Sequence, residues 1–277
     1  MALKRQGWKV ILMEKMVVAS GISCFCVKCT VFLRNAERMN DYLFFQPNEN
    51  FHLFGQQHLL VIALTVAMSI SLAIFAKKKL APDGQLLLGR GITVVLAIMV
   101  VGWIAIRLAL GQFDHKTDLP LDICNIVALA LPLLMWNPDR RVHEVLYFWV
   151  MAGTIQALLT PHLFEGFPHF TFIKYFTVHG GLVVFAVYAT VIYGIRPGWR
   201  SLWRSFFALQ IYILSLYLIN RLLGSNYAYL MGKPPTASAL DYLGDYPWYL
   251  LVSEGLALVM FILVLLPVLP RREVVKA

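Results

Sequence analysis

The sequence predicts an all-α protein, a polytopic helical bundle that crosses a membrane about seven times. Of its 277 residues, 59% are hydrophobic and only 14% are charged, whereas a soluble domain carries about 25% charged and about 45–50% apolar residues. The mean hydropathy is +0.68, and the apolar residues form continuous runs rather than the alternating segments of a membrane barrel. This composition excludes ordinary soluble proteins and disordered chains. The four cysteines form no disulfide framework.

Seven apolar runs approach the roughly 20 residues that a helix needs to cross the hydrocarbon core. We expect spans at 58–76, 91–110, 119–136, 144–160, 173–194, 204–223 and 247–269. The third and fourth runs are the shortest. Turn-forming residues separate several of the runs, at 82–84, 137–139 and 196–198. Since the chain shows no internal repeat, we expect residues 39–277 to form a single multipass transmembrane domain.

Basic residues orient this bundle, because Lys and Arg are enriched in cytoplasmic loops. The connections after spans one, three and five and the tail after span seven hold twelve Lys and Arg residues. The opposite side has far fewer, namely Lys116, Lys174, Lys233, Arg107 and Arg221. We therefore expect the N-terminus of the bundle outside and the C-terminus in the cytoplasm. The formal net charge of +9 then reflects topology and the N-terminal extension, and we expect no nucleic acid as a partner.

The first 38 residues do not fit this orientation. They contain seven Lys or Arg residues and two acidic ones, which would contradict the charge rule if they lay outside. We interpret residues 1–38 as an N-terminal extension, either a start-site artefact that precedes Met39 or a signal-like segment that crosses at 17–33. Three cysteines lie here, Cys24, Cys26 and Cys29, without the second half of a metal or cluster site. We expect no metal and no other cofactor.

Polar residues inside the spans gather in their outer halves. Ionisable groups within a membrane are expensive and mark functional sites by default. The candidates are Arg107, Asp122, Cys124, His179, Arg221 and Glu254, with Asn125, Gln156 and Asn220 as neutral neighbours. Six of the seven histidines also fall on the outer side. We expect a polar pocket that opens outward above an apolar inner half, covered by the long outer loop 224–246 with Asn226 and Tyr227.

Cys124 is the candidate nucleophile, because a thiolate is reactive and a nearby histidine such as His179 can accept its proton. Asp122 could orient that histidine, as in a catalytic triad. However, Asp122 and Cys124 lie about 200° apart around a helix axis, so the chain would have to bend near Pro120 for both to meet one imidazole. Substrate contacts are expected from Arg107, Asn125, Gln156, Arg221, Asn226, Tyr227 and Glu254. The alternative for Cys124 is a packed thiol without a chemical role.

Several segments resemble the bacterial YwaF-type integral membrane family, over about residues 45–269. The segments are 119–124, 156–161, 179–181, 224–227 and 245–249. That family is similar, more distantly, to a eukaryotic multipass protein described as a cysteine-dependent phospholipid acyltransferase. The resemblance implies lipid acyl transfer or hydrolysis, with Cys124 as nucleophile, His179 as the histidine and Asn226 at a matching asparagine. The family commonly has a histidine where this chain has Asp122, and a carboxylate there disfavours a thiolate.

Two other function classes stay open. A zinc-dependent membrane hydrolase would need three histidines and an acid. The candidate ligands, which show no close spacing, are His58, Asp122, His162, His179 and Glu254. A transporter or receptor for a small anionic solute would use Arg107 and Arg221, but the repeats and broken helices typical of transporters are missing.

The expected partners and location follow from the membrane bundle and the resemblance. We expect membrane lipids as partners and a multipass location in the bacterial inner or plasma membrane. The sequence leaves the substrate, the acyl acceptor and the oligomeric state open.

Overall fold

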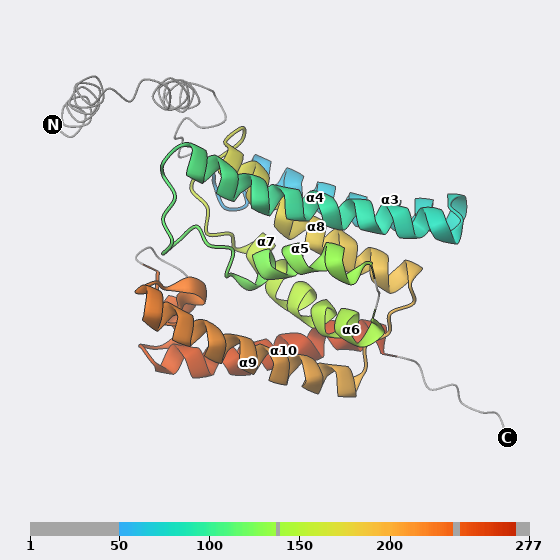
Figure 1. The fold of residues 1–277 in the computed structure, drawn as a ribbon. Helices are drawn as coiled ribbons and strands as arrows, with labels where there is room; N and C mark the ends of the chain where they lie inside the picture. Colours follow the sequence, from blue (N-terminus) through green and yellow to red (C-terminus); the bar gives the residue numbers. More distant parts are fainter. Residues whose placement is uncertain (1–49, 137–138, 235–238, 270–277) are drawn as a thin grey trace, which may run out of the picture.

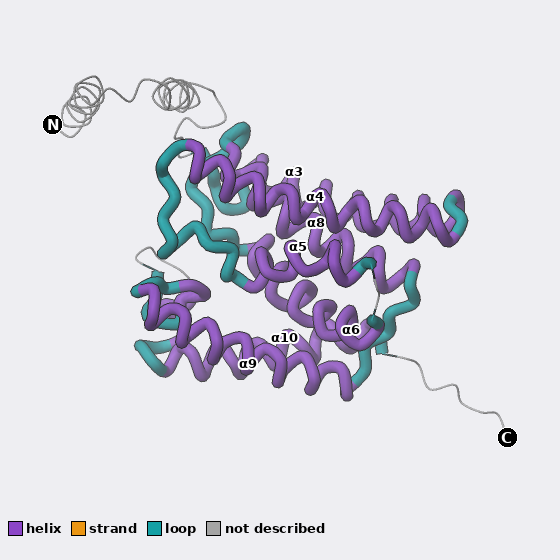
Figure 2. The backbone as a smooth tube through the Cα atoms, in the orientation of Figure 1, coloured by secondary structure: helices purple, strands orange, loops and turns teal. Residues whose placement is uncertain are grey.

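The computed structural model describes residues 50–136, 139–234 and 239–269 of the chain. Figure 1 and Figure 2 show them as helices joined by loops, with no strand in the described part. The all-α bundle predicted from the apolar runs is therefore confirmed. The expected N-terminal extension 1–38 lies outside the described residues.

Among these residues, six helical segments are long and apolar enough to cross a membrane. They are α3 (Gln56–Lys79), α4 (Pro82–Ala109), the continuous segment Arg140–Leu159, α8 (Phe170–Ile192), α9 (Trp199–Leu223) and the segment Trp248–Val268, which begins with α10 (Trp248–Leu265). The continuous segment consists of α6 (Arg140–Phe148), a π-helical stretch (Trp149–Thr154) and α7 (Ile155–Leu159). The seventh apolar helix, α5 (Ile123–Leu134), has only 12 residues, which is about 18 Å at 1.5 Å per residue. The third expected span, 119–136, is thus shorter than predicted.

α8 is the central helix of the bundle. It buries residues along most of its length and packs against α3, α4, α5 and the segment Arg140–Leu159. α9 and α10 lie together on the other side of α6 (Figure 1). There, Phe148 of α6 packs on Phe261 of α10 with ring centroids 5.2 Å apart. The two groups of helices therefore meet along the segment that contains the π-helical stretch.

Two adjacent glycines allow α3 and α4 to approach α8 closely. A Cβ atom added to Gly180 would lie 2.8 Å from Thr65 Oγ1 on α3. One added to Gly181 would lie 2.4 Å from the Leu96 side chain on α4. Small residues have this role in membrane bundles, where close packing rather than the hydrophobic effect drives helix association. Gly180 and Gly181 therefore set the spacing of α3 and α4 around α8.

One end of the bundle collects the basic residues that the sequence assigns to the cytoplasm. The α3–α4, α5–α6 and α8–α9 connections meet there, together with the end of α10 (Figure 1). Glu144 joins α6 to α9 at this end, because it accepts a hydrogen bond from Ser201 Oγ at 2.6 Å. Arg140 Nε, at 3.0 Å, and Arg204 Nη1, at 3.7 Å, form ion pairs with the same carboxylate. The helix directions thus agree with the orientation predicted from the charge pattern.

Replacing Gly181 by alanine should loosen the contact between α4 and α8. The new methyl group would overlap the Leu96 side chain, and overpacking of this kind costs about 1–3 kcal/mol. We expect a lower thermal unfolding midpoint for the purified protein in nanodiscs, and a smaller effect of the same change in a Leu96→Ala background. Gly102→Ala is the control, because a Cβ atom there meets nothing within 4 Å. Equal midpoints for Gly181→Ala and Gly102→Ala would refute this packing role.

Candidate functional site

The helix that carries Cys124 begins later than the apolar pattern suggested. α5 starts at Ile123, and residues 119–122, expected to be the first turn of a span, are not helical. Tyr212 of α9 forms hydrogen bonds with two of the peptide groups that have no helical partner here. Its hydroxyl donates to the Leu121 carbonyl at 2.8 Å, and the hydroxyl oxygen accepts a hydrogen bond from the Ile123 N–H. Peptide groups that lack helical partners are thus paired by a side chain.

Tyr227 supports the residues just before this stretch in the same way. Its hydroxyl accepts a hydrogen bond from the Leu119 N–H and donates to the His115 carbonyl, both at 2.9 Å. Asn220 holds Tyr227 in turn, because its amide accepts from the Tyr227 N–H and donates to the Tyr227 carbonyl, both at 2.9 Å. Tyr227, expected as a substrate contact, therefore has its hydroxyl engaged by backbone groups.

Asn226 lies half-buried in the loop between α9 and α10. Its side-chain oxygen accepts a hydrogen bond from the Met231 N–H, and its amide nitrogen donates to the Gly232 carbonyl, both at 2.8 Å. Tyr249 of α10 adds a hydrogen bond from its hydroxyl to the Tyr229 carbonyl. The described part of the loop that was expected to cover the site is thus held by its own backbone and by both flanking helices.

Cys124 is the second residue of α5 and lies half-buried. Its Sγ atom is 3.6 Å from Oγ1 of Thr154, the buried last residue of the π-helical stretch. The first N–H groups of a helix have no intrahelical partner, and the helix dipole is positive there, which favours a thiolate or an oxyanion. π-Helical turns are also frequent at functional sites. Cys124 therefore lies at the positive end of a short helix, next to a threonine hydroxyl.

The ring of His179 is oriented by its own helix. Nδ1 lies 2.8 Å from the Tyr175 carbonyl. Because a carbonyl only accepts, Nδ1 of the neutral ring carries the proton and Nε2 is the proton acceptor. Tyr175 also stacks on the imidazole with ring centroids 4.1 Å apart, and its hydroxyl donates to the Ala157 carbonyl at 2.9 Å. His179 is thus held in the tautomer that a general base requires.

A small polar cavity lies beside the start of α5. Its volume is about 70 Å³, and Asp122, Asn125 and Lys174 line it together with Asp118. Burial raises the pKa of the Asp122 carboxyl, while Lys174 and a hydrogen bond from the Ala228 N–H oppose this rise. The cavity therefore combines a carboxyl group, an amide and an amine next to the candidate nucleophile.

Within the described residues, no hydrogen bond joins Asp122, Cys124 and His179 to one another. Since Asp122 precedes α5 rather than lying in it, its expected angular separation from Cys124 around a helix axis no longer applies. Lys174 interacts electrostatically with Asp122, Cys124 and His179. Lys174 is thus the group that interacts with all three residues, which lack the hydrogen bonds of an assembled triad in the described part of the chain.

Sequence reasoning missed Lys174 and Thr154. Lys174 was assigned to the outer side because the expected span began at 173, whereas α8 begins at Phe170. The apolar residues on both sides of Lys174, from Phe172 to Phe176, were the signal that it lies inside a helix with an apolar environment. A single Thr154 in an apolar run gave no comparable signal.

The two arginines expected to bind an anion have different surroundings. Arg107 Nε lies 3.1 Å from the Asp118 carboxylate, and the guanidinium carbon is 5.7 Å from the centre of the Trp103 ring. Arg221 is exposed in the last turn of α9. Arg107 is therefore already paired, whereas Arg221 faces away from packed protein.

Gln156 and Glu254, the remaining expected substrate contacts, bond to nearby side chains. Gln156 is exposed, and its amide nitrogen donates to Thr160 Oγ1 at 3.2 Å. Glu254 of α10 accepts a hydrogen bond from the Gln210 amide of α9. Neither residue makes a hydrogen bond to Cys124 in the described part of the chain.

His58 has both ring nitrogens engaged. It is fully buried, and the Phe54 N–H donates to its Nδ1 at 2.9 Å, so its Nε2 donates to the Leu158 carbonyl at 2.7 Å. Within residues 50–136, 139–234 and 239–269, no three His, Cys, Asp or Glu side chains lie close enough to hold a metal ion. The ligands expected for a zinc site are therefore not brought together.

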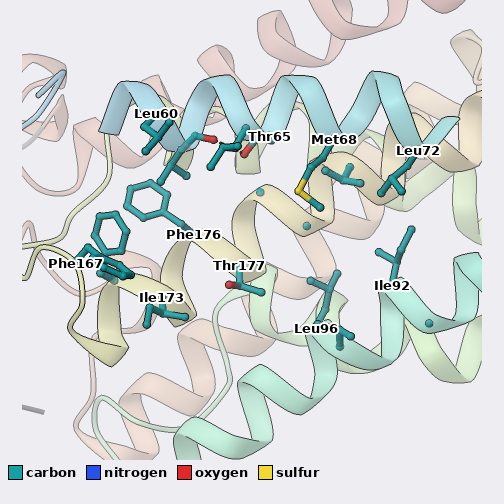
Figure 3. A pocket seen from close by; sticks show the side chains of 18 of the residues that line it. Leu60, Thr65, Met68, Leu72, Ile92, Leu96, Phe167, Ile173, Phe176 and Thr177 are labelled. Atoms are coloured by element: carbon teal, nitrogen blue, oxygen red, sulfur yellow. Dashed lines mark hydrogen bonds between the residues drawn. The ribbon is translucent and has the colours of Figure 1, made fainter. Parts of the chain in front are cut away.

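A larger cavity of about 770 Å³ lies between α3, α4 and α8. Figure 3 shows its apolar walls, which include Leu60, Met68, Leu72, Ile92, Leu96, Ile173 and Phe176. This apolar groove follows α3 from Gln57 to Leu72, which is about 22 Å at 1.5 Å per residue. The sequence predicted one polar pocket that opens outward, whereas the structure has a small polar cavity and a long apolar groove.

Removing the Tyr212 hydroxyl should weaken the start of α5. Tyr212→Phe would leave the Leu121 carbonyl without this partner, and an unpaired buried backbone group costs about 1–3 kcal/mol. We expect a lower thermal midpoint in nanodiscs and faster labelling of Cys124 by a maleimide, because the first turn would open more often. Tyr217→Phe on the same helix is the matched control, since its hydroxyl makes no hydrogen bond within the described residues. Identical behaviour of the two variants would rule out the supporting role.

Comparison with known protein families gives one match. Residues 53–265 match the model of the TMEM164 family, a range that takes in every helix from α3 to α10. Comparison with curated proteins and with solved structures finds no match.

Proposed function

Because the chain belongs to the TMEM164 family of multipass membrane proteins, we propose that it transfers or hydrolyses a lipid acyl group, with Cys124 as nucleophile and His179 as base. The observation that carries the proposal is the position of Cys124 in the first turn of an internal helix, beside a polar cavity. The sequence resemblance to the YwaF-type family, and through it to a cysteine-dependent phospholipid acyltransferase, implies the same two residues.

The reaction has two balanced steps. In the first, Nε2 of His179 takes the proton from the Cys124 thiol, and sulfur attacks the carbonyl carbon of a lipid ester. The ester C–O bond breaks, the leaving oxygen receives the proton from the imidazolium, and a thioester remains on Cys124. In the second step, His179 deprotonates water or a lipid hydroxyl, which attacks the thioester and releases the thiol.

When the sulfur attacks, negative charge develops on the ester carbonyl oxygen, and hydrogen-bond donors at the start of α5 must stabilise it. The N–H groups of the first helical turn have no intrahelical partner and suit a developing oxyanion. The Asn125 side chain lines the adjacent polar cavity and is the candidate side-chain donor. Thr154 lies 3.6 Å from the sulfur and keeps it on this side of α5. Cys124 and His179 must approach each other when the substrate binds, as is common when an unoccupied site closes around its substrate.

The apolar groove supports a lipid as the substrate. Three candidate membrane spans, α3, α4 and α8, form its walls, so apolar chains of a bilayer would fill it. Ile173 lines the groove and the next residue, Lys174, lines the polar cavity. An acyl chain along the groove would therefore bring its ester end toward the polar cavity. We place the site in the outer half of a cell membrane and, on the YwaF resemblance, in the bacterial plasma membrane.

The structure favours neither of the other two functions. The expected zinc ligands are not brought together within the described residues, and His58 uses both nitrogens in hydrogen bonds. For a carrier of anions, Arg107 is already paired with Asp118. The lipid proposal needs neither a metal nor a free arginine.

The proposal predicts that a thiol-reactive acyl probe labels Cys124. We expect Cys124→Ala to abolish labelling of the peptide that contains this residue. Loss of the base in His179→Ala should reduce the labelling rate about 10²-fold or more. His52→Ala, at an exposed histidine, is the control and should label as wild type does. Labelling is read by mass spectrometry, because other thiols lie in residues 1–38. Absence of acyl labelling at Cys124 in every lipid tested would contradict the proposal.

A further inference from the structure

Lys174 is a cation in an apolar helix, and no direct partner for it lies among the described residues. It lies in the first turns of α8, between apolar neighbours, and lines the polar cavity with Asp122 and Asn125. Its ammonium makes no hydrogen bond or ion pair at contact distance within the described residues. A charged group in a membrane-spanning helix is expensive, so its position calls for a function.

We propose that Lys174 is the positioning residue of the Cys124 site, whose positive charge balances Asp122 and favours the thiolate of Cys124. This inference rests on the proposed function, but its test measures the reactivity of the thiol alone. Lys174 would act through space on Cys124 and would not itself touch the reacting carbonyl group.

The chain geometry carries this assignment. Asp122 and Asn125 line the cavity, and Cys124 stands between them in the chain at the positive end of α5. Lys174, on α8, lines the same cavity as Asp122 and Asn125 and interacts electrostatically with Asp122 and Cys124.

Among the charged groups that line the cavity, only Lys174 can stabilise a negative charge on the sulfur. Among its lining residues there are two carboxylates and a single cation. One carboxylate, Asp118, is paired with Arg107 at 3.1 Å. The other, Asp122, opposes the thiolate, whereas Lys174 favours it. The remaining titratable groups that interact with this cluster are Tyr175, His179, Tyr212, Tyr227 and Tyr229. Burial has the largest influence on the Cys124 thiol, and Asp122 and Lys174 act on it in opposite directions.

The test is the alkylation rate of Cys124 by iodoacetamide as a function of pH, in the full chain reconstituted in nanodiscs. We expect Lys174→Met to slow alkylation at neutral pH about tenfold, the equivalent of one pH unit in the thiolate equilibrium, and Lys174→Arg to stay near wild type. Asp122→Asn should have the opposite effect, and the double variant should lie between the two single ones. Lys116→Met, at an exposed lysine, controls for general charge loss.

Each outcome separates a charge effect from a structural one. If Lys174→Met folds but alkylates as wild type does, or if Lys174→Arg is as slow as Lys174→Met, the inference is wrong. Should Lys174→Met fail to fold, Asp122→Asn decides, since an unchanged or slower rate there also overturns the inference. The two proposals fail separately. If no acyl group labels Cys124, the proposed reaction is wrong. The effect of Lys174 on the rate of Cys124 alkylation by iodoacetamide can still be measured in that case.

Discussion

A peptide group that leaves a helix within a membrane has no water to bond, so another protein group must replace the lost partner. This requirement shapes the region before α5. Residues 119–122 are irregular, and two tyrosines supply what a helical turn would have supplied. Tyr212 bonds the peptide groups around Leu121, and Tyr227 bonds those before it. With these bonds in place α5 can begin at Ile123, and that position puts Cys124 in the first turn rather than inside a continuous helix.

The site therefore depends on elements that contribute no reacting atom. Tyr212 belongs to α9, and Tyr227 belongs to the following loop, which Asn220 at the end of α9 holds in place. Cys124 and His179 lie on α5 and α8, in the other part of the bundle. One group of helices thus carries the candidate catalytic residues, while the other supplies the hydrogen bonds that hold the start of α5 in place. The glycines on α8 complete this division, since they bring α3 and α4 close enough to enclose the apolar groove.

Apolar runs were sufficient to predict the fold, because a membrane span must be continuous and apolar whatever it packs against. They could not predict the start of α5. Pro120 suggested a bend before Cys124, but the hydrogen-bond partners of Leu119 and Leu121, which fix where the helix begins, lie about a hundred residues away in the chain. Cys124 and His179 could be singled out as polar residues within spans. Lys174 was not singled out, because it stands at the edge of the expected span 173–194 and was counted with the outer basic residues, whereas α8 begins three residues earlier, at Phe170.

The π-helical stretch Trp149–Thr154 limits how the chain length can vary during evolution. A π turn accommodates more residues than an α turn, so deleting one residue from this stretch would restore a regular α-helix there. The side chains on one side of the deletion would then rotate by about 100° relative to the other. Thr154 would lose its alignment with Cys124, although the helix would still span the membrane and keep its hydropathy. Homologous chains with a one-residue gap at this stretch should therefore differ in what faces the sulfur, even where the rest of the bundle is unchanged.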